Sequence, residues 1–121
     1  MIDIAQPLKN GSLYAGPHPV YTKRFLLCKE EDQPDTMTWP DAYSIKGSFK
    51  LPSFRETMVL AAYYAFLGIN GAWYWSSLQV NGFHAWAYNC IDGEHILDSL
   101  NSKNCVRLVK TVTQEELEAL V

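Results

Sequence analysis

Three cysteines and three histidines are among the residues of this sequence that could serve as a nucleophile, a general base or a metal ligand. If Asp92 and Gly93 form a two-residue hairpin turn, Cys90 faces His95 on the neighbouring strand. A thiol beside an imidazole is the arrangement of an activated cysteine nucleophile. A structural cross-strand contact is the alternative for this pair, and it is the one we expect. An enzyme that uses Cys90 or Cys105 stays an alternative function.

The sequence offers no other constellation for catalysis or cofactor binding. Its cysteines, Cys28, Cys90 and Cys105, are odd in number and widely spaced, so we expect three reduced, largely buried thiols. A Cys90–Cys105 disulfide is the alternative in an oxidising compartment. The histidines at positions 18, 84 and 95 lack metal-site spacing, and there is no phosphate-cradling glycine loop and no serine elbow. The sequence therefore predicts recognition rather than reaction, with no catalytic residue, metal or cofactor.

Length and charge limit the classes of protein to which the chain can belong. Its 121 residues are 48% hydrophobic, which fits one domain, residues 1–121, with a real core. Ten basic against 13 acidic residues leave a net charge of −3, which argues against a nucleic-acid partner. No secretory signal is visible, and the longest apolar run, residues 58–67, is about half of a membrane span. We expect a cytoplasmic or virion protein without a membrane partner.

Glycine turns divide the second half of the chain into a meander of strands. Asn81-Gly82 and Asp92-Gly93 bracket a strand at 83–91, with neighbouring strands at 72–78 and 94–100. Alternation places His84, Trp86 and Tyr88 on one face of the middle strand. Further extended segments are expected at 12–15, 23–28 and 105–112.

Two helices are predicted between the early and the late strands. The first begins at Thr38 as the capping residue, with Pro40 in its first turn, and stops at Gly47. The second begins at the capping-box spacing of Ser53 and Glu56 and continues to residue 67, ahead of a C-terminal glycine. A further short helix is expected within the C-terminal segment 113–121, where the capping spacing recurs.

A stretch without any charged residue, 57–91, marks the expected core, because unpaired charge is costly to bury. It includes three of the four tryptophans. We expect all four indoles to be structural core: Trp39, Trp73, Trp75 and Trp86. Trp75 and Trp86 would lie on neighbouring strands and pack against the second helix.

Several short motifs occur in an order that resembles the Lcl C-terminal domain family, over about residues 11–110. The matching segments are MTWPDA at 37–42, KLPSFRE at 50–56, WYWSS at 73–77, AW at 85–86, DG at 92–93 and VRLV at 106–109. The resemblance implies an α+β, C-type lectin-like fold, in which two helices pack on a small, mostly antiparallel sheet. LYAG at 13–16 and FLL at 25–27 look like the opening strands of a subgroup of this family that phages and prophages often carry.

The resemblance together with the missing catalytic constellation predicts a non-enzymatic binding module for a protein or a glycan. The polar residues in or beside the loops of the late meander are the ligand-binding candidates: Gln79, Asn81, His84, Asn101, Lys103 and Asn104. A self-assembling phage subunit, joined through the tail 113–121, is the alternative, so homo-oligomerisation stays open. Arg107 is expected to pair with Glu56 or Asp92 in a structural contact.

One motif has a calcium-lectin counterpart. Gln33-Pro34-Asp35 has the letters of a tripeptide that binds sugar through calcium in C-type lectins. Here it precedes the first helix, within an acidic turn, and the partner motif of those lectins is absent. We therefore expect a solvated loop rather than a calcium site.

Overall fold

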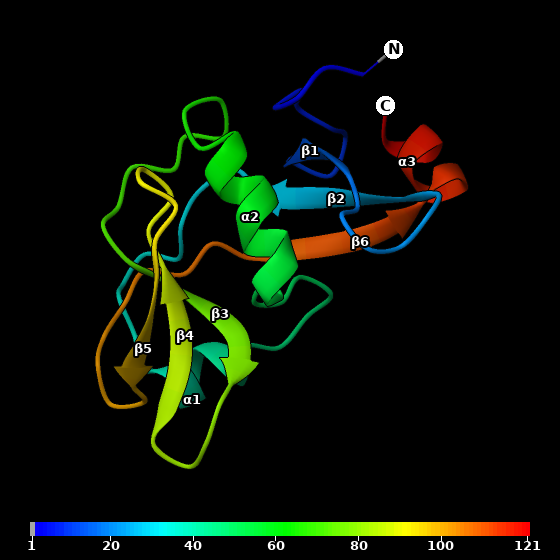
Figure 1. The fold of residues 1–121 in the computed structure, drawn as a ribbon. Helices are drawn as coiled ribbons and strands as arrows, with labels where there is room; N and C mark the ends of the chain where they lie inside the picture. The colour runs from blue at the N-terminus through cyan, green and yellow to red at the C-terminus, as the bar shows by residue number, and fades with distance from the viewer. Residues whose placement is uncertain (1) are drawn as a thin grey trace.

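The computed structural model describes residues 2–121, which form three helices and six strands (Figure 1). The strands make two small antiparallel sheets. This confirms the α+β class, but the single sheet expected from the sequence is wrong. The elements in chain order are β1 Ser12–Pro17, β2 Arg24–Lys29, α1 Trp39–Tyr43, α2 Phe54–Ala62, β3 Tyr74–Gln79, β4 His84–Tyr88, β5 His95–Ser99, β6 Val109–Thr113 and α3 Gln114–Leu120.

The first sheet joins the two ends of the chain. Its strand order is β1-β2-β6, so the last strand lies antiparallel beside an early one, and the two termini lie near each other (Figure 1). A bulge interrupts the β1–β2 pairing between Tyr14 and Gly16, where Gly16 adopts a φ of +111° that other residues rarely accept. The strands between residues 29 and 109 therefore form a separate layer.

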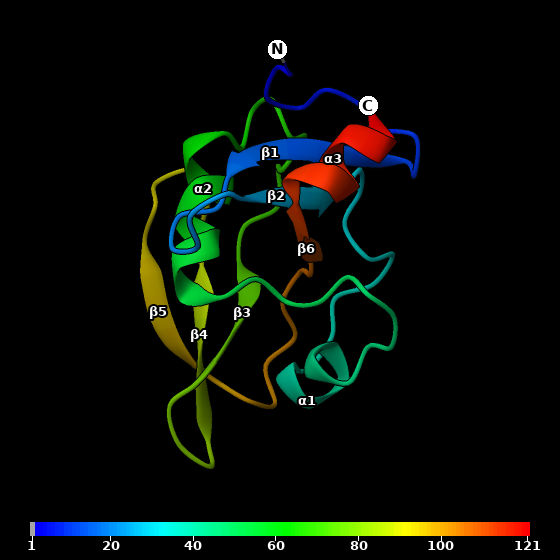
Figure 2. The ribbon, with the colours of Figure 1, turned by 90° about the vertical axis from the view of Figure 1, so that its right-hand side faces the viewer.

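The second sheet is the meander expected from the glycine turns. Its order is β3-β4-β5, and its β3–β4 hairpin projects at the lower end of the molecule in both views (Figures 1 and 2). Hydrophobic side chains cover both faces of this sheet. On one face Tyr74 and Tyr88 join the core beneath α2, and on the other Trp75, Ala85 and Ala87 pack with α1.

The capping signals are confirmed where both partners of a capping box are present. Ser53 and Glu56 exchange their side-chain bonds at the start of α2, and Thr113 and Glu116 do the same at α3. Thr38 is the N-cap residue of α1, as expected, but its side chain makes no cap hydrogen bond. Both predicted helices are also too long, since α1 ends at Tyr43 and residues 63–68 after α2 form turns.

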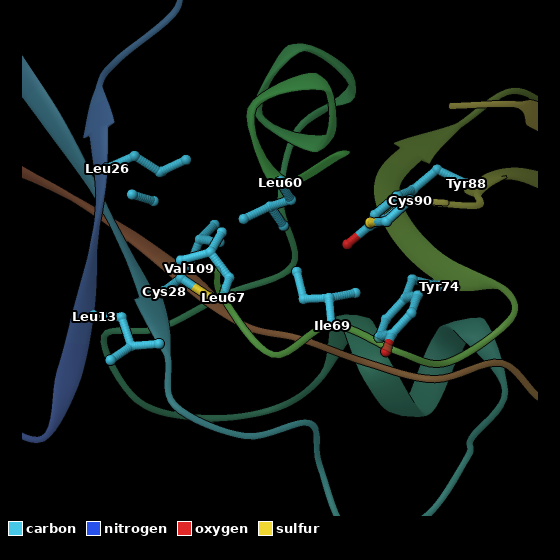
Figure 3. Packing of buried hydrophobic residues seen from close by; sticks show 11 residues of the cluster. Leu13, Leu26, Cys28, Leu60, Leu67, Ile69, Tyr74, Tyr88, Cys90 and Val109 are labelled. Carbon is cyan, nitrogen blue, oxygen red and sulfur yellow. The ribbon is translucent and has the colours of Figure 1, made fainter. Parts of the chain in front are cut away.

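Three hydrophobic clusters hold the layers together. In the first cluster Leu60 and Ile69 lie between residues of the first sheet and the tyrosines of the second (Figure 3). The second cluster contains Trp39 and Trp75, which are both buried. Leu117 of α3 is buried in the third cluster, against the first sheet. The apolar face of the tail therefore packs on its own domain.

The other two tryptophans are only half-buried. Trp86 packs edge-on against Phe54 at the start of α2, with 5.7 Å between ring centroids, as expected. Trp75 instead points to the α1 side, where its Nε1 donates to the Met37 carbonyl at 2.8 Å. Its expected packing on the second helix is wrong, because Trp75 pairs with Ala87, and Trp86, the preceding residue of β4, points to the opposite face of the sheet. None of the helices in residues 2–121 has the length and apolarity of a membrane crossing.

Candidate functional site

The tip of the β3–β4 hairpin carries the most exposed large apolar side chain among the described residues. Phe83 is 76% exposed, and Leu78 and Val80 are each more than two-fifths exposed beside it. An apolar group of this size in water is unfavourable unless something covers it. The tip therefore has the composition of a contact surface.

Polar side chains of the same hairpin hold its backbone in one shape. The Asn81 side-chain oxygen accepts the amides of Phe83 and His84 at 2.8 and 3.0 Å, and it lies 3.2 Å from His84 Nδ1. Gln79 Nε2 donates to the Asn81 carbonyl at 2.9 Å. Three predicted ligand-binding residues, Gln79, Asn81 and His84, are thus brought together, but they bond mainly to the hairpin itself. This ordering lowers the entropy lost when a partner binds.

The remaining predicted residues divide between surface and interior. Asn101 and Lys103 are exposed, and the loop that carries them starts beside the tip, because the Leu100 amide donates to the Phe83 carbonyl at 2.9 Å. Asn104 is only 8% exposed and donates to Asp98 Oδ2 at 3.0 Å, so its expected exposure is wrong. Its amide side chain anchors the loop rather than facing a ligand.

Asp98 is the acceptor that anchors this loop. Burial alone would raise its pKa, but hydrogen bonds from Asn104, Ser102 and the Ser99 amide together lower it. Its carboxylate therefore stays ionised at neutral pH, beside the outer strand of the sheet.

A groove runs from the tip towards the β1–β2 loop. It encloses about 400 Å³ and is lined by Leu78, Phe54 and Arg55 on one side and by Val20 and Tyr21 on the other. Tyr21 is exposed and stacks on His18, with 4.8 Å between ring centroids. Apolar surface thus continues from the hairpin tip to a second loop far away in the sequence.

The floor of the groove is the buried pair His18–Glu56. His18 Nδ1 accepts the amides of Val20 and Tyr21, both at 3.1 Å, which requires the ring proton on Nε2. Nε2 then donates to Glu56 Oε2 at 2.6 Å, while Glu56 Oε1 accepts the Ser53 amide. Every site on this imidazole is occupied, so it cannot act as a base and instead ties the β1–β2 loop to α2.

The structure does not form the predicted thiol–imidazole pair. Asn89 and Glu94 close a longer loop with an amide-to-carbonyl bond of 2.8 Å, and the register then places Tyr88 opposite His95. The expectation of Cys90 opposite His95 is wrong, because the turn is longer than the two residues assumed. His95 instead lies 2.8 Å from the Thr57 hydroxyl, with its Nε2 towards the oxygen.

The environment of the cysteines opposes nucleophilic chemistry. Cys28 and Cys90 are buried and Cys105 is half-buried, and all three are free thiols. Burial raises the pKa of Cys28 and of Cys105, and it raises that of Cys90 to about 12. Since the thiolate is the reactive form, burial lowers the reactivity of these cysteines. No group of histidine, cysteine and acidic residues within 2–121 could hold a metal ion.

Arg107 is buried and has a different partner from the one expected. Its Nε donates to Asp32 Oδ1 at 2.7 Å, not to Glu56 or Asp92. The other guanidinium nitrogens donate to the carbonyls of Lys29, Leu67 and Gly68 at 2.8–3.1 Å. The segment that follows β2 returns past the start of β6 and places Asp32 within reach. The pairing is structural, as expected, because only 2% of Arg107 is exposed.

Gln33, in the Gln33-Pro34-Asp35 segment, makes a backbone hydrogen bond to the segment that precedes β6. The Gln33 amide donates to the Val106 carbonyl at 2.8 Å, and Pro34 and Asp35 are exposed.

No protein-family model matches the chain, and no curated protein matches it.

The exposed apolar surface is what sequence reasoning missed. The charge-free stretch 57–91 was interpreted as core, yet it also supplies Leu78, Val80 and Phe83 at the surface. The signal was present, since alternate apolar residues at 78 and 80 next to a turn glycine indicate a hairpin end. Tyr21 lies outside the stretch and gave no signal by its position.

Proposed function

We propose that this chain is a non-enzymatic module that binds a protein partner through the β3–β4 tip and the groove beside it. The exposure of Phe83 carries the proposal, together with Leu78 and Val80 on a hairpin that its own side chains hold rigid. Interface cores are rich in aromatic and apolar anchors with a polar rim, and the tip has this composition. Asn101 and Lys103 would then belong to the rim.

A protein partner is favoured over a glycan. Glycans are bound by free polar groups aligned beside an aromatic ring, but Gln79 and Asn81 use their hydrogen bonds within the hairpin. The large apolar side chains of Leu78, Val80 and Phe83 are exposed to solvent at the tip. The tip therefore supports a partner that brings apolar side chains of its own.

The proposal includes the fold family and the origin suggested by the motifs. Pairing of an early strand with the last one, two intervening helices and a separate meander support a C-type lectin-like architecture. Membership of the Lcl C-terminal domain family, and a phage or prophage origin, rest on the motif resemblance. A binding role fits a scaffold whose titratable groups are structurally engaged, such as Arg107 and the His18–Glu56 pair.

Affinity capture from a lysate of the bacterium that carries the gene tests the proposal. The bait is compared with Phe83→Ser and with the matched control Phe66→Ser, whose side chain is also exposed but lies after α2. We expect one protein to be retained by the wild-type chain and by the control and to be lost with Phe83→Ser. Melting temperatures of the three baits within about 3 °C of each other show that the loss is not unfolding. Equal retention by all three baits refutes a role for the tip.

A further inference from the structure

The outer edge of the second sheet is open. β5 comes last in the order β3-β4-β5, and no bridge from elsewhere in residues 2–121 reaches its other side. In Figure 2 the strand forms the left-hand rim of the molecule. An open edge is a template for another strand.

The hydrogen-bond alternation of the β4–β5 ladder shows which backbone groups are free. In an antiparallel ladder, residue pairs joined by backbone hydrogen bonds alternate with pairs that are not. The hydrogen-bonded pairs Asn89/Glu94 and Phe83/Leu100 lie at the two ends of the β4–β5 ladder. The alternation between them leaves the N–H and C=O groups of His95, Leu97 and Ser99 directed away from β4.

Two of these three residues remain without partners. The Ser99 amide donates to Asp98 Oδ1 at 2.8 Å, and its carbonyl accepts the Ser102 amide at 2.9 Å. The backbone groups of His95 and Leu97 make no hydrogen bond with any other described residue. The edge thus offers two donors and two acceptors, spaced as an antiparallel strand requires.

The side chains along this edge favour a basic partner. Ile96 and Leu97 are partly exposed, at 37% and 47%, and the acidic residues Glu94 and Asp98 flank them. A second copy that used all four free groups would place Glu94 opposite the Asp98 of the other copy, twice over. Like charges directly opposite one another destabilise a strand pair, whereas lysine or arginine there stabilises it.

We propose that β5 accepts an extended basic segment of a partner protein as a fourth, antiparallel strand. Its pattern is a basic residue opposite Asp98 and another opposite Glu94, with three residues between them, the middle one apolar against Ile96. The surface is distinct from the tip, and it goes beyond the function proposed above. A negative result for strand addition at β5 therefore does not test the proposed role of the tip, and a negative result for the tip does not test strand addition.

Three blocked synthetic peptides test the proposal by NMR titration of the wild-type chain at millimolar peptide. They contain Lys-Val-Val-Thr-Lys, its charge-reversed form Glu-Val-Val-Thr-Glu, and Lys-Pro-Val-Pro-Lys, which keeps the charge but cannot donate to His95 or Leu97. We expect saturable shifts of the His95 and Leu97 amides with the first peptide, about tenfold weaker binding of the second, and no such shifts with the third.

A charge variant supplies the matched control. Glu94→Lys should abolish the preference between the lysine and glutamate peptides, because each peptide then faces one acidic and one basic side chain. Glu31→Lys, with the same change in net charge but after β2, should leave the preference unchanged. Equal binding of the proline peptide, or no shift with any peptide, overturns strand addition. Shifts of the same amides on concentrating the chain alone would assign the edge to a second copy and also overturn the proposal.

Discussion

Replacing Arg107 by methionine tests whether one buried guanidinium ties the end of the first sheet to the turn after α2. Arg107 joins Asp32 and the carbonyls of Lys29, Leu67 and Gly68, which come from the end of the first sheet and from the turn after α2. Methionine fills a similar volume and donates no hydrogen bond. The substitution therefore removes the polar contacts and little of the packing.

The magnitude follows from what is left unpaired. Removing one partner of a buried ion pair costs about 3–5 kcal/mol, because a charge stays behind without compensation. The Asp32 side chain is 24% exposed and keeps the bond from the Tyr74 hydroxyl at 2.7 Å, so the lower end applies, about 3 kcal/mol. With a urea slope of about 1.5 kcal/mol per M, the unfolding midpoint falls by about 2 M.

Urea denaturation followed by tryptophan fluorescence measures this shift. Arg24→Met, at an exposed arginine, is the control and should change the free energy of unfolding by less than about 0.5 kcal/mol. A double-mutant cycle with Asp32→Asn should give a coupling of at least about 1 kcal/mol. A loss below about 1 kcal/mol for Arg107→Met, or no coupling, would refute the account of this network.

Three further predictions concern the core, the thiols and pH. Trp75→Ala should lower the free energy of unfolding by about 3–5 kcal/mol, more than Trp86→Ala, because only Trp75 is fully buried; urea midpoints of both variants check this order. With a pKa of about 12, Cys90 should resist a thiol reagent at pH 8 until denaturant is added, while half-buried Cys105 reacts first; fast reaction of Cys90 in the native protein would contradict this. Burial lowers the pKa of His95 in the folded protein below its unfolded value of about 6.5. The contribution of neutral His95 to the free energy of unfolding is therefore complete above about pH 6.5 and is lost as pH falls through the folded pKa. The decrease in the free energy of unfolding between about pH 7.5 and 5.5 should be smaller in His95→Gln.

The accurate parts of the sequence interpretation depend on residues close together in the chain. Ser53 and Glu56 are three residues apart, and their capping box forms wherever the backbone turns into a helix. The meander and its hairpin ends were likewise marked by short turn signals. Such interactions involve one turn of backbone, so a local pattern is enough to predict them.

The helix ends show where local patterns stop being sufficient. Residue 67 was expected to close α2, but Leu67 and Gly68 instead turn their carbonyls to Arg107, roughly forty positions later. A helix continues only while its own hydrogen bonds compete successfully with such tertiary ones. The apolar periodicity of 58–67 carries no information about that competition.

The sequence by itself determined the α+β class, the two capping boxes, the meander of the late strands and the burial of Trp39 and Trp75. Only the tertiary structure decided that Asp32 pairs with Arg107, that Tyr88 rather than Cys90 faces His95, and that Phe83 and the edge of β5 stay uncovered. The physical reason is range: caps and turns are satisfied within a few residues, whereas ion-pair partners and exposed surfaces depend on the path of the whole backbone.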